Sequence, residues 1–417
     1  MYDWANSAYQ TIIVASVFPI YFADVASAGI DDNVTQSRFA TSKTIAILLT
    51  AIIAPILGAL ADSRPLKKPL LGWFLGIGVS ATAAMFWIHE GNWQLALTLS
   101  VISNIAVAGS IVFYESLLPH IAPSSEVDRV STAGYAIGYI GGGLCLAFCL
   151  TLIQQPAWFG IPNTGTAVRI SFVFCAAWWL LFSIPIFRDV PEPILTRDLA
   201  TSSIGAALRD SGRQLLQTFH ELRKFKQALL FLVAFFIYND GVQTMIAMAA
   251  IYAFQLGIPS SSLITALLIT QFVGIPFSFL FGAVASRIGA KKGVFIGITV
   301  YLAITVFAYW LQYAWQFYVL AIAVGMVQGG TQALSRSIFA SMVPRAKSTE
   351  FFAFFSVFER YASLLGPALF AMMAKYGYGR EAILSLIVFF VGGGILLSRV
   401  DVAAGQDAAR AADAAAA

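Results

Sequence analysis

The stretch GALADSRPLKKP (Gly58–Pro69) places three basic residues between two long uncharged runs, and it recurs 224 residues later as GAVASRIGAKKG (Gly282–Gly293). The uncharged runs beside the first copy cover Thr44–Ala61 and Pro69–Ile88. About 20 apolar residues cross the hydrocarbon core of a bilayer as an α-helix. The stretch therefore predicts two membrane-spanning helices joined by a short charged turn, and its recurrence predicts that this pair of helices occurs twice.

The composition of the whole chain is that of a membrane protein. Of its 417 residues, 59% are hydrophobic and 11% are charged, and the mean hydropathy is +0.79, whereas soluble domains carry about 25% charged residues. Lipid offers no hydrogen-bond partner to an open backbone, so the spans must be helices. Dividing the uncharged runs at clusters of Pro, Gly and Ser predicts an all-α polytopic membrane protein with twelve transmembrane helices in two pseudo-symmetric six-helix halves. The predicted helices cover roughly residues 2–26, 43–61, 69–88, 93–119, 131–154, 167–188, 226–254, 261–286, 292–311, 315–343, 350–376 and 379–399.

Lysine and arginine are distributed unequally between the predicted loops. With the N-terminus inside, sixteen of them fall on the cytoplasmic side and about five on the other side. The positive-inside rule then places both termini in the cytoplasm, and we expect a multi-pass protein of the cell membrane, the inner membrane of a bacterium.

One long polar segment divides the predicted helices six and six. This segment, 189–225, carries apolar residues at helical spacing and predicts an amphipathic helix on the cytoplasmic membrane surface. It separates an N-terminal half (1–188) from a C-terminal half (226–400). Residues 401–417 form a low-complexity, alanine-rich tail, which we exclude from the predicted fold.

Residue types that enzymes and metal sites require are scarce. The chain has three histidines and three cysteines, and Cys145, Cys149 and Cys175 all fall inside predicted spans without a metal-ligand or disulfide spacing. No nucleophile–base pair is evident in the spans, so we expect no enzymatic activity, no cofactor and no metal. The net charge of +4 reflects the loop bias rather than affinity for nucleic acid. The partners that we expect are a small-molecule substrate and membrane lipid, and we expect a monomer.

Two further repeats support an internal duplication. SLLPHIA and SMVPRAK place Pro119 opposite Pro344, and NSAYQTII from Asn6 aligns with NDGVQTMI from Asn239. Two six-helix halves related by duplication are typical of secondary transporters, whose substrate site lies near the membrane midplane between the repeats.

The opening stretch resembles the signature between helices 2 and 3 of the major facilitator superfamily. Its second copy has Ser286 where the first has Asp62, and the first copy has Pro65 and one extra residue before its lysines. In that superfamily the loop is a gating element, so the resemblance implies a gating role for its charged residues. The alternative is that the positive charges only set the topology. The residues concerned are Asp62, Arg64, Lys67, Lys68 and Arg287.

A narrower resemblance extends over the whole chain. YDWANSAYQT, FYESLLPHIA, GYAIGYIGGGL, FFIYNDGVQT, VQGGTQALSRSIFA and EFFAFFSVFERYASLLGP resemble, in the same order, motifs of a branch that contains fungal vacuolar amino-acid effluxers and bacterial members. This resemblance implies a secondary active transporter that exports an amino acid or a related small polar solute by alternating access. Two alternatives remain open: a proton-coupled exporter of amphipathic compounds such as drugs or lipids, and a membrane receptor that does not transport.

Polar residues recur on single faces of three predicted helices. A carboxylate at the bilayer centre costs roughly 2.5–3.5 kcal/mol on insertion scales, so it is kept where water, a partner or a ligand meets it. The alternative for Asn and Gln is that they only link helices, at roughly 0.6 kcal/mol per hydrogen bond. The faces comprise Asp3, Asn6 and Gln10 on the first helix, Asn239, Asp240 and Gln243 on the seventh, and Gln328, Gln332, Ser335 and Arg336 on the tenth.

The superfamily resemblance implies that helices 1, 4, 7 and 10 line the central cavity, which assigns roles to these faces. Asp240 lies 14 residues beyond Lys226, or ~21 Å along a helix and past the midplane, so we predict that Asp240, together with Asp3, couples transport to H⁺ or Na⁺. Arg336 and Glu359 lie at similar depth and form a candidate ion pair, either a cytoplasmic gate or a static bridge. The predicted substrate-binding residues are Asn6, Tyr9, Gln10, Asn239, Gln243, Gln328 and Gln332.

A ridge of glycines marks the fifth predicted helix. Gly134, Gly138 and Gly142 recur at intervals of four, which lets another helix approach closely. We interpret this ridge as a packing surface rather than an antiport signature. Gly366 and the proline after it predict a bend in the eleventh helix.

Overall fold

The structure is a computed structural model that describes residues 1–63, 65–122, 126–193, 223–255, 260–362, 365–366, 369, 372–373 and 381–416. The predicted amphipathic helix between the halves falls almost entirely outside these residues, as does Arg64. All regular structure in the described residues is helical.

The chain divides into two compact units. The first unit comprises Met1–Leu117 and Ile137–Leu195, and the second comprises Leu118–Ala136 and Thr196–Ala417. Segment Leu118–Ala136, which precedes the long polar linker in sequence, thus packs with the C-terminal helices. Helix α7 (Val127–Gln154) contributes its first turns to the second unit and the rest of its length to the first.

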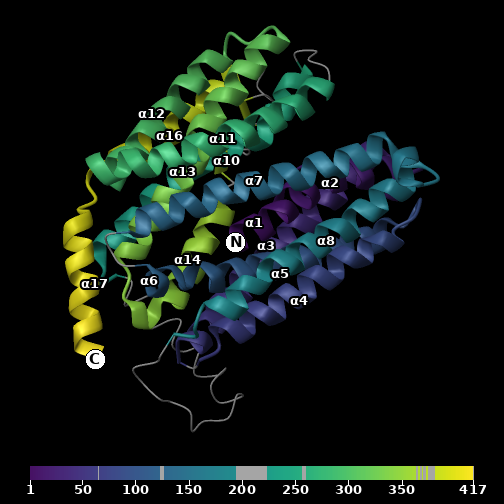
Figure 1. Ribbon diagram of the computed structural model, residues 1–417. Helices are drawn as coiled ribbons and strands as arrows, with labels where there is room; N and C mark the ends of the chain where they lie inside the picture. The colour runs from purple at the N-terminus through teal and green to yellow at the C-terminus, as the bar shows by residue number, and fades with distance from the viewer. Residues whose placement is uncertain are drawn as a thin grey trace. The chain divides into compact units, whose positions relative to one another are not determined.

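The first unit is built from long helices, of which α4, α5 and α8 run side by side (Figure 1). A short connection joins α4 to α5, and Asn163 caps the start of α8 by accepting a hydrogen bond from the Thr166 N–H at 2.8 Å. The elements are α1 (Tyr2–Tyr9), η1 (Gln10–Ala15), α2 (Val17–Tyr21), η2 (Phe22–Ala26), α3 (Asp32–Ser63), α4 (Lys67–Ala84), η3 (Met85–Trp87), α5 (Trp93–Ser116), α7 (Val127–Gln154), η4 (Pro156–Phe159) and α8 (Thr164–Asp189).

The second unit holds the C-terminal helices together with a short helix from segment Leu118–Ala136. Its elements are α6 (Leu118–Ile121), α10 (Lys226–Gln255), α11 (Ser260–Ile288), α12 (Ala290–Ala308), α13 (Ala314–Ser341), η5 (Arg345–Lys347), α14 (Ser348–Tyr361), η6 (Glu381–Leu386), α16 (Ile387–Ser398) and α17 (Val402–Ala416).

Helix packing repeats between the two units. In the first unit, α1 packs on α8, α3 on α5, and α4 on both α5 and α8. In the second unit, α10 packs on α16, α11 on α13, and α12 on both α13 and α16. These pairs join the same positions in the order of the predicted spans. The duplication predicted from the sequence repeats is therefore confirmed in the packing of the fold.

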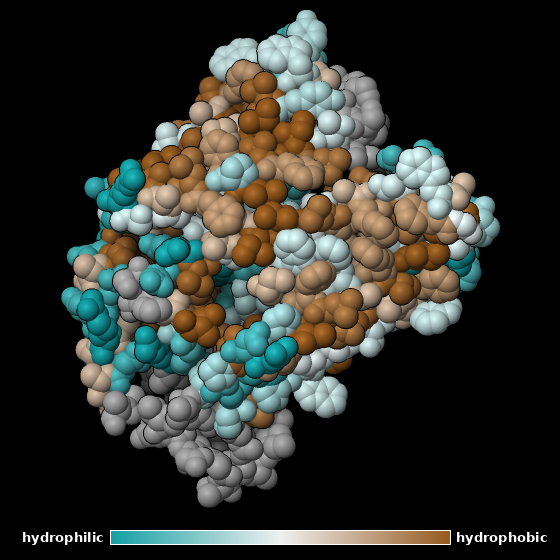
Figure 2. Space-filling view, in the orientation of Figure 1, coloured by the Kyte–Doolittle hydropathy of each residue, from teal (hydrophilic) through white to brown (hydrophobic). Residues whose placement is uncertain are grey.

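Nine helical segments in the described parts of the chain are long and apolar enough to cross a membrane, or ten if the bent pair α16–α17 counts as one span. They match nine of the twelve predicted spans. The other three predicted spans correspond to α3, to α14 with the partly undescribed residues after it, and to η6 with α16. Large apolar side chains such as Trp73 and Ile52 are exposed on the helices. In Figure 2, brown hydrophobic residues extend along the helices and teal hydrophilic residues gather around α17.

The first span is not the single regular α-helix that the sequence predicts over 2–26. It contains two π-helical segments, η1 and η2, and the backbone leaves helical geometry at Ser16, where φ is −132° and ψ is −79°. Pro19 lacks an N–H and cannot donate to the carbonyl of Ala15. The Ser16 hydroxyl donates to the Thr11 carbonyl at 2.6 Å. π-Helical turns inside α-helices often occur at functional sites.

The residues that we excluded as a low-complexity tail are ordered as helix α17. Asp401 caps its start by accepting from the Ala404 N–H at 3.0 Å, and alanine has the highest helix propensity of all residues. The helix is attached to α13 and η5, because Gln406 donates to the Ser341 hydroxyl at 3.2 Å and Asp413 accepts from the Arg345 N–H at 2.8 Å. The exclusion of this segment from the fold was therefore wrong.

Candidate functional site

In the second unit, a hydrogen-bonded chain of amides joins three helices. The Gln332 side chain on α13 donates through Nε2 to Asn239 Oδ1 on α10 at 2.7 Å, and Asn239 Nδ2 donates to the backbone carbonyl of Glu359 on α14 at 3.4 Å. Asn239 is fully buried and Gln332 nearly so. Next to this chain, the hydroxyls of Tyr238 and Ser335 lie 2.6 Å apart. The polar faces predicted for helices 7 and 10 therefore meet inside the unit.

Asp240 follows Asn239 and points toward a different group of donors. Its carboxylate accepts from the backbone N–H groups of Gly366 at 2.8 Å and Leu365 at 3.1 Å, and from the Thr244 hydroxyl at 3.1 Å. The first N–H groups after a helix interruption lack intrahelical partners, and α14 ends at Tyr361. The buried carboxylate thus satisfies backbone donors just beyond that helix end.

Gly366 has no room for a side chain. A Cβ atom at this position would lie 2.7 Å from Asp240 Oδ1 and would overlap the Thr244 hydroxyl. The bend predicted at Gly366 coincides with this close approach between the chain after α14 and helix α10.

In the first unit, α1 and α5 meet through two polar pairs. Tyr9 donates to the Ser103 hydroxyl at 2.8 Å, with both side chains fully buried, and Tyr114 donates to the carboxylate of Asp3. These helices are the first and fourth spans, so the pairs correspond by position to those between α10 and α13. Asp3 and Tyr9, both predicted as site residues, therefore have partners on the same neighbouring helix.

Four of the predicted substrate-binding residues have no hydrogen-bond partner for their side chains within the described part of the chain. Each carries an amide, which offers both a donor and an acceptor. Asn6 is buried, and the other three are half-buried. An amide in a membrane-spanning helix is costly without a partner, so these groups are suited to bind water or a solute. The four are Asn6 and Gln10 in the first unit and Gln243 and Gln328 in the second.

The glycine ridge of α7 packs against α1 and the start of η1. A Cβ atom at Gly138 would lie 2.7 Å from Ser7 Oγ, and one at Gly142 would lie 2.8 Å from Thr11 Oγ1. The packing interpretation of the ridge is confirmed at these two positions. Close packing here fixes the helix that carries Asn6 and Gln10.

The lysines of the opening stretch lie against helix ends. Lys68 donates through Nζ to the Phe187 carbonyl at 2.8 Å and also to the Val190 carbonyl, at the end of α8. In return, the Glu192 carboxylate accepts from the backbone N–H groups of Lys67 at 2.7 Å and Lys68 at 2.9 Å, at the start of α4. The Lys67 side chain is buried. Each charge matches the sign of the helix end that it meets.

The second copy repeats one of these contacts. Lys291 at the start of α12 donates to the carbonyls of Ser398 at 2.9 Å and Val400 at 2.7 Å, at the end of α16. Arg287 is exposed, and Asp62 lies in α3 with its side chain outside the described residues. The repeated basic cluster therefore places one lysine on the C-terminus of the last span of each half.

Arg336 on α13 contacts the first turns of α7. Its Nε donates to the Ser131 hydroxyl at 2.9 Å and its Nη2 to the Ser131 carbonyl at 3.1 Å, and its guanidinium lies 4.7 Å from the ring centroid of Tyr135. Beside it, the Ser337 hydroxyl donates to the carboxylate of Asp128. The predicted Arg336–Glu359 pair stays a prediction.

Sequence reasoning missed the partners of Arg336. They lie about 200 residues away in the chain, and the only available signal was the spacing of four between Ser131 and Tyr135, which puts both on one face of α7. A separate contact joins His120 to the later helices of the same unit, since its Nε2 lies 3.1 Å from the Ser348 hydroxyl at the start of α14.

Comparison with known proteins gives consistent results. The family model described as "Vacuole effluxer Atg22 like" matches residues 1–410. The chain is 37% identical over 405 residues to the MFS-type transporter YxiO of Bacillus subtilis (strain 168), covering 96% of this chain and 93% of that protein. It is 23% identical over 432 residues to autophagy-related protein 22 of Yarrowia lipolytica, covering 84% and 72%. The E. coli fucose:proton symporter FucP matches the fold with a TM-score of 0.69 at 14% identity, covering 96% of both chains. The all-α major facilitator fold predicted from the sequence is confirmed.

Proposed function

This chain belongs to the Atg22-like vacuole effluxer family, and on this basis we propose that it exports an amino acid or a related small polar solute. The chain is a multi-pass membrane protein and a secondary transporter of the major facilitator type. The identity of the solute, the direction of transport and its coupling to an ion are proposals. We also propose a cell-membrane location with both termini in the cytoplasm, a division into halves at the polar linker, and a monomeric state.

The observation that carries this proposal is the set of four amides whose side chains have no hydrogen-bond partner among the residues that the structure describes. Asn6, Gln10, Gln243 and Gln328 belong to the first, seventh and tenth spans, which the family resemblance places around the transport cavity. Each amide can donate to a carboxylate and accept from an ammonium group. A zwitterionic solute presents both groups, so the amides can bind either end without a fixed charge that would hold the solute too tightly.

Coupling to H⁺ or Na⁺ is assigned to Asp240 and Asp3. Both are carboxylates in membrane-spanning helices, where ionisable groups mark ion and proton pathways. Asp240 is supported by its burial and by its link from α10 to the chain after α14. Asp3 is supported by its bond to Tyr114 on α5. A change in the charge of either carboxylate would alter a contact between two helices.

Gating is assigned to Arg336, Ser131 and Tyr135. The contact lies within the second unit, but Ser131 and Tyr135 belong to helix α7, whose later turns belong to the first unit. It would therefore break if α7 moved as one piece away from α13 during alternating access. An arginine with two separate donors suits a contact that forms in only one geometry.

The proposal is tested by flux in proteoliposomes that contain the purified protein, with radiolabelled amino acids as solutes. Gln243→Leu and Gln328→Leu replace amides that have no described partner by apolar groups of similar size, so we expect unchanged or raised thermal stability and at least tenfold lower flux. Thr299→Val, on the exposed face of α12, is the matched control and should transport normally.

Three results would contradict the proposal. Normal flux in both glutamine variants would remove the amides from the substrate site. Flux of amphipathic dyes without flux of any amino acid would favour the drug or lipid exporter. A thermal shift with amino acids but no flux under any ion gradient would indicate a receptor.

A further inference from the structure

One arginine of the first unit stacks on a tryptophan at the start of a membrane-spanning helix. The guanidinium of Arg38 on α3 lies 3.8 Å from the ring centroid of Trp93, the first residue of α5. Tryptophan is enriched at the membrane–water interface, and arginine binds phosphate through a planar set of donors. Stacking uses the face of the guanidinium and leaves N–H groups at its edge for another ligand.

Below this pair, a groove runs between α3 and α5. It has a volume of about 400 Å³. Its lining comprises Arg38, Thr41, Ser42, Thr98 and the apolar Leu97 toward one end, and Ile45, Val101 and Ile102 toward the middle of the span. The cationic and hydroxyl groups of the lining thus lie toward one end, and the lining toward the other end is hydrocarbon. An amphipathic ligand with an anionic head matches this order.

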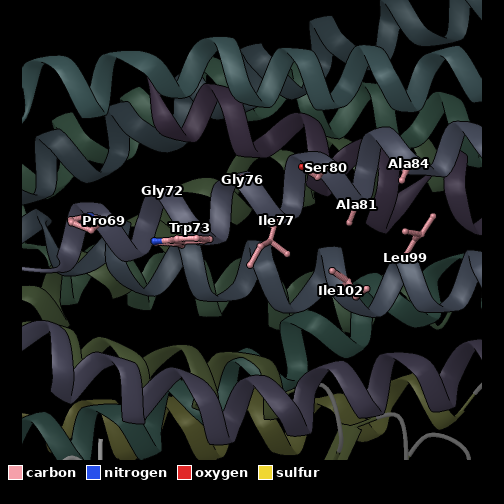
Figure 3. Close-up of a pocket in the computed structure, with 10 residues that line it drawn as sticks. All are labelled: Pro69, Gly72, Trp73, Gly76, Ile77, Ser80, Ala81, Ala84, Leu99 and Ile102. Carbon is pink, nitrogen blue, oxygen red and sulfur yellow. The ribbon is translucent and has the colours of Figure 1, made fainter. Parts of the chain in front are cut away.

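A second groove lies on the other side of α5, between α5 and α4 (Figure 3). Its volume is about 800 Å³, and Ile102 lines it as well as the first groove. The α4 wall includes Gly76, where a Cβ atom would meet no other atom within 4 Å, and the exposed side chains of Trp73 and Ile77. Two open apolar grooves thus flank one helix and share its ridge at Ile102.

We propose that an anionic phospholipid binds astride α5 in the first unit, with its phosphate on Arg38 and its two acyl chains in the two grooves. Charge complementarity selects the head, because Arg38 has no acidic partner among the described residues. The grooves select the acyl chains, because their walls away from Arg38 are mainly hydrocarbon side chains that are exposed on the helix surface, such as Ile45, Ile77 and Ile102. A free phosphate ion would use Arg38 alone and would gain nothing from the grooves.

The experiment is native mass spectrometry of the delipidated full chain in detergent, titrated with phosphatidylglycerol. We expect one lipid adduct on the wild type. Arg38→Gln should weaken its binding about tenfold, the change expected for losing one charge-assisted hydrogen bond worth about 1.4 kcal/mol. Gly76→Leu fills the groove beside α4 without touching Arg38 and should also weaken binding of the two-chain lipid severalfold, but not that of lysophosphatidylglycerol, which has one chain.

Arg169→Gln is the matched control, because Arg169 also lies over an aromatic ring, that of Phe86, and contacts His89 but lines neither groove. It should bind phosphatidylglycerol like the wild type. Equal adducts on Arg38→Gln and wild type would overturn the proposal, as would equal binding of zwitterionic phosphatidylethanolamine. Displacement of the lipid by millimolar inorganic phosphate would identify a site for free anions instead. Thermal unfolding without lipid checks that each variant is folded. If Arg38→Gln does not fold, Gly76→Leu still tests the proposal independently.

Discussion

The Gly366 N–H donates to the carboxylate of Asp240 at 2.8 Å, across 126 positions of the chain. The contact is possible because residue 366 has no side chain, so the backbone beyond α14 can approach α10 closely. The contact joins Gly366, where the sequence predicts a bend, to Asp240, which is predicted to couple transport to an ion. A change at either residue should therefore affect the other.

Replacing Gly366 by alanine should disturb this contact. The new methyl group would lie against Asp240 Oδ1 and overlap the Thr244 hydroxyl, and overpacking of this kind costs about 1–3 kcal/mol. We expect a lower apparent melting temperature in detergent for Gly366→Ala. Gly76→Ala, where the methyl group meets open space, is the control and should melt like the wild type. Equal melting of the two variants would show that the chain around residue 366 can shift freely.

Asp240→Asn separates the structural part of this residue from its proposed coupling role. An amide has one acceptor oxygen and a group that only donates, so it cannot accept from Thr244, Leu365 and Gly366 as the carboxylate does. We expect a loss of about 1–3 kcal/mol of stability and transport that no longer depends on a pH or sodium gradient, while exchange of labelled for unlabelled solute persists.

Thr244→Val is the matched variant for this prediction. It removes one donor to Asp240 but keeps the charge, so it should lose about 1 kcal/mol of stability and retain gradient-driven accumulation. If the Asp240→Asn variant also accumulates solute when an ion gradient drives it, Asp240 serves only as a structural hydrogen-bond acceptor. The coupling residue must then be sought at Asp3.

The repeated lysine contacts predict equal effects in the two units. Lys68→Met and Lys291→Met each remove a cation from the carbonyls at a helix end, which costs about 0.3–2 kcal/mol. The two effects should add, because the residues have no common partner. Lys292→Met removes the exposed neighbour of Lys291 and should leave the melting temperature unchanged. A double variant no less stable than either single one would argue against independent helix-end contacts.

Much of this architecture could be predicted because hydropathy and lipid impose helices on the chain. The duplication was visible in the basic clusters at Gly58 and Gly282 and is present in the packing. The meeting of Asn239 and Gln332 followed from polar residues on single faces of helices 7 and 10, since such faces avoid lipid and turn inward.

The rest depended on contacts that leave no local pattern. The donors to Asp240 are backbone groups, which any residue would supply. Glu192 binds the start of α4 and lies at the beginning of a long polar segment. The composition of that segment does not predict which of its carboxylates contacts a helix. Helix α17 could have been predicted, because Asp401 is a good N-cap residue and the alanines after it have the highest helix propensity. The low complexity of the segment led us to exclude it.

Arg336→Lys tests whether the contact with α7 is a dynamic one. Lysine keeps the charge but has one nitrogen, so it cannot donate from two separate groups to the Ser131 hydroxyl and carbonyl or stack on Tyr135 as a plane. We expect residues 127–136 to exchange their backbone hydrogens several times faster in the variant, because local opening governs this exchange, while α12 exchanges as in the wild type. Ser131→Ala should act in the same direction but less, since the carbonyl acceptor remains, and the double variant should show less than the sum of the two effects. Arg287→Lys, at an exposed position, is the control. Unchanged exchange in Arg336→Lys would mean that this segment is held by other contacts, and Arg336 would then lose its proposed role in gating.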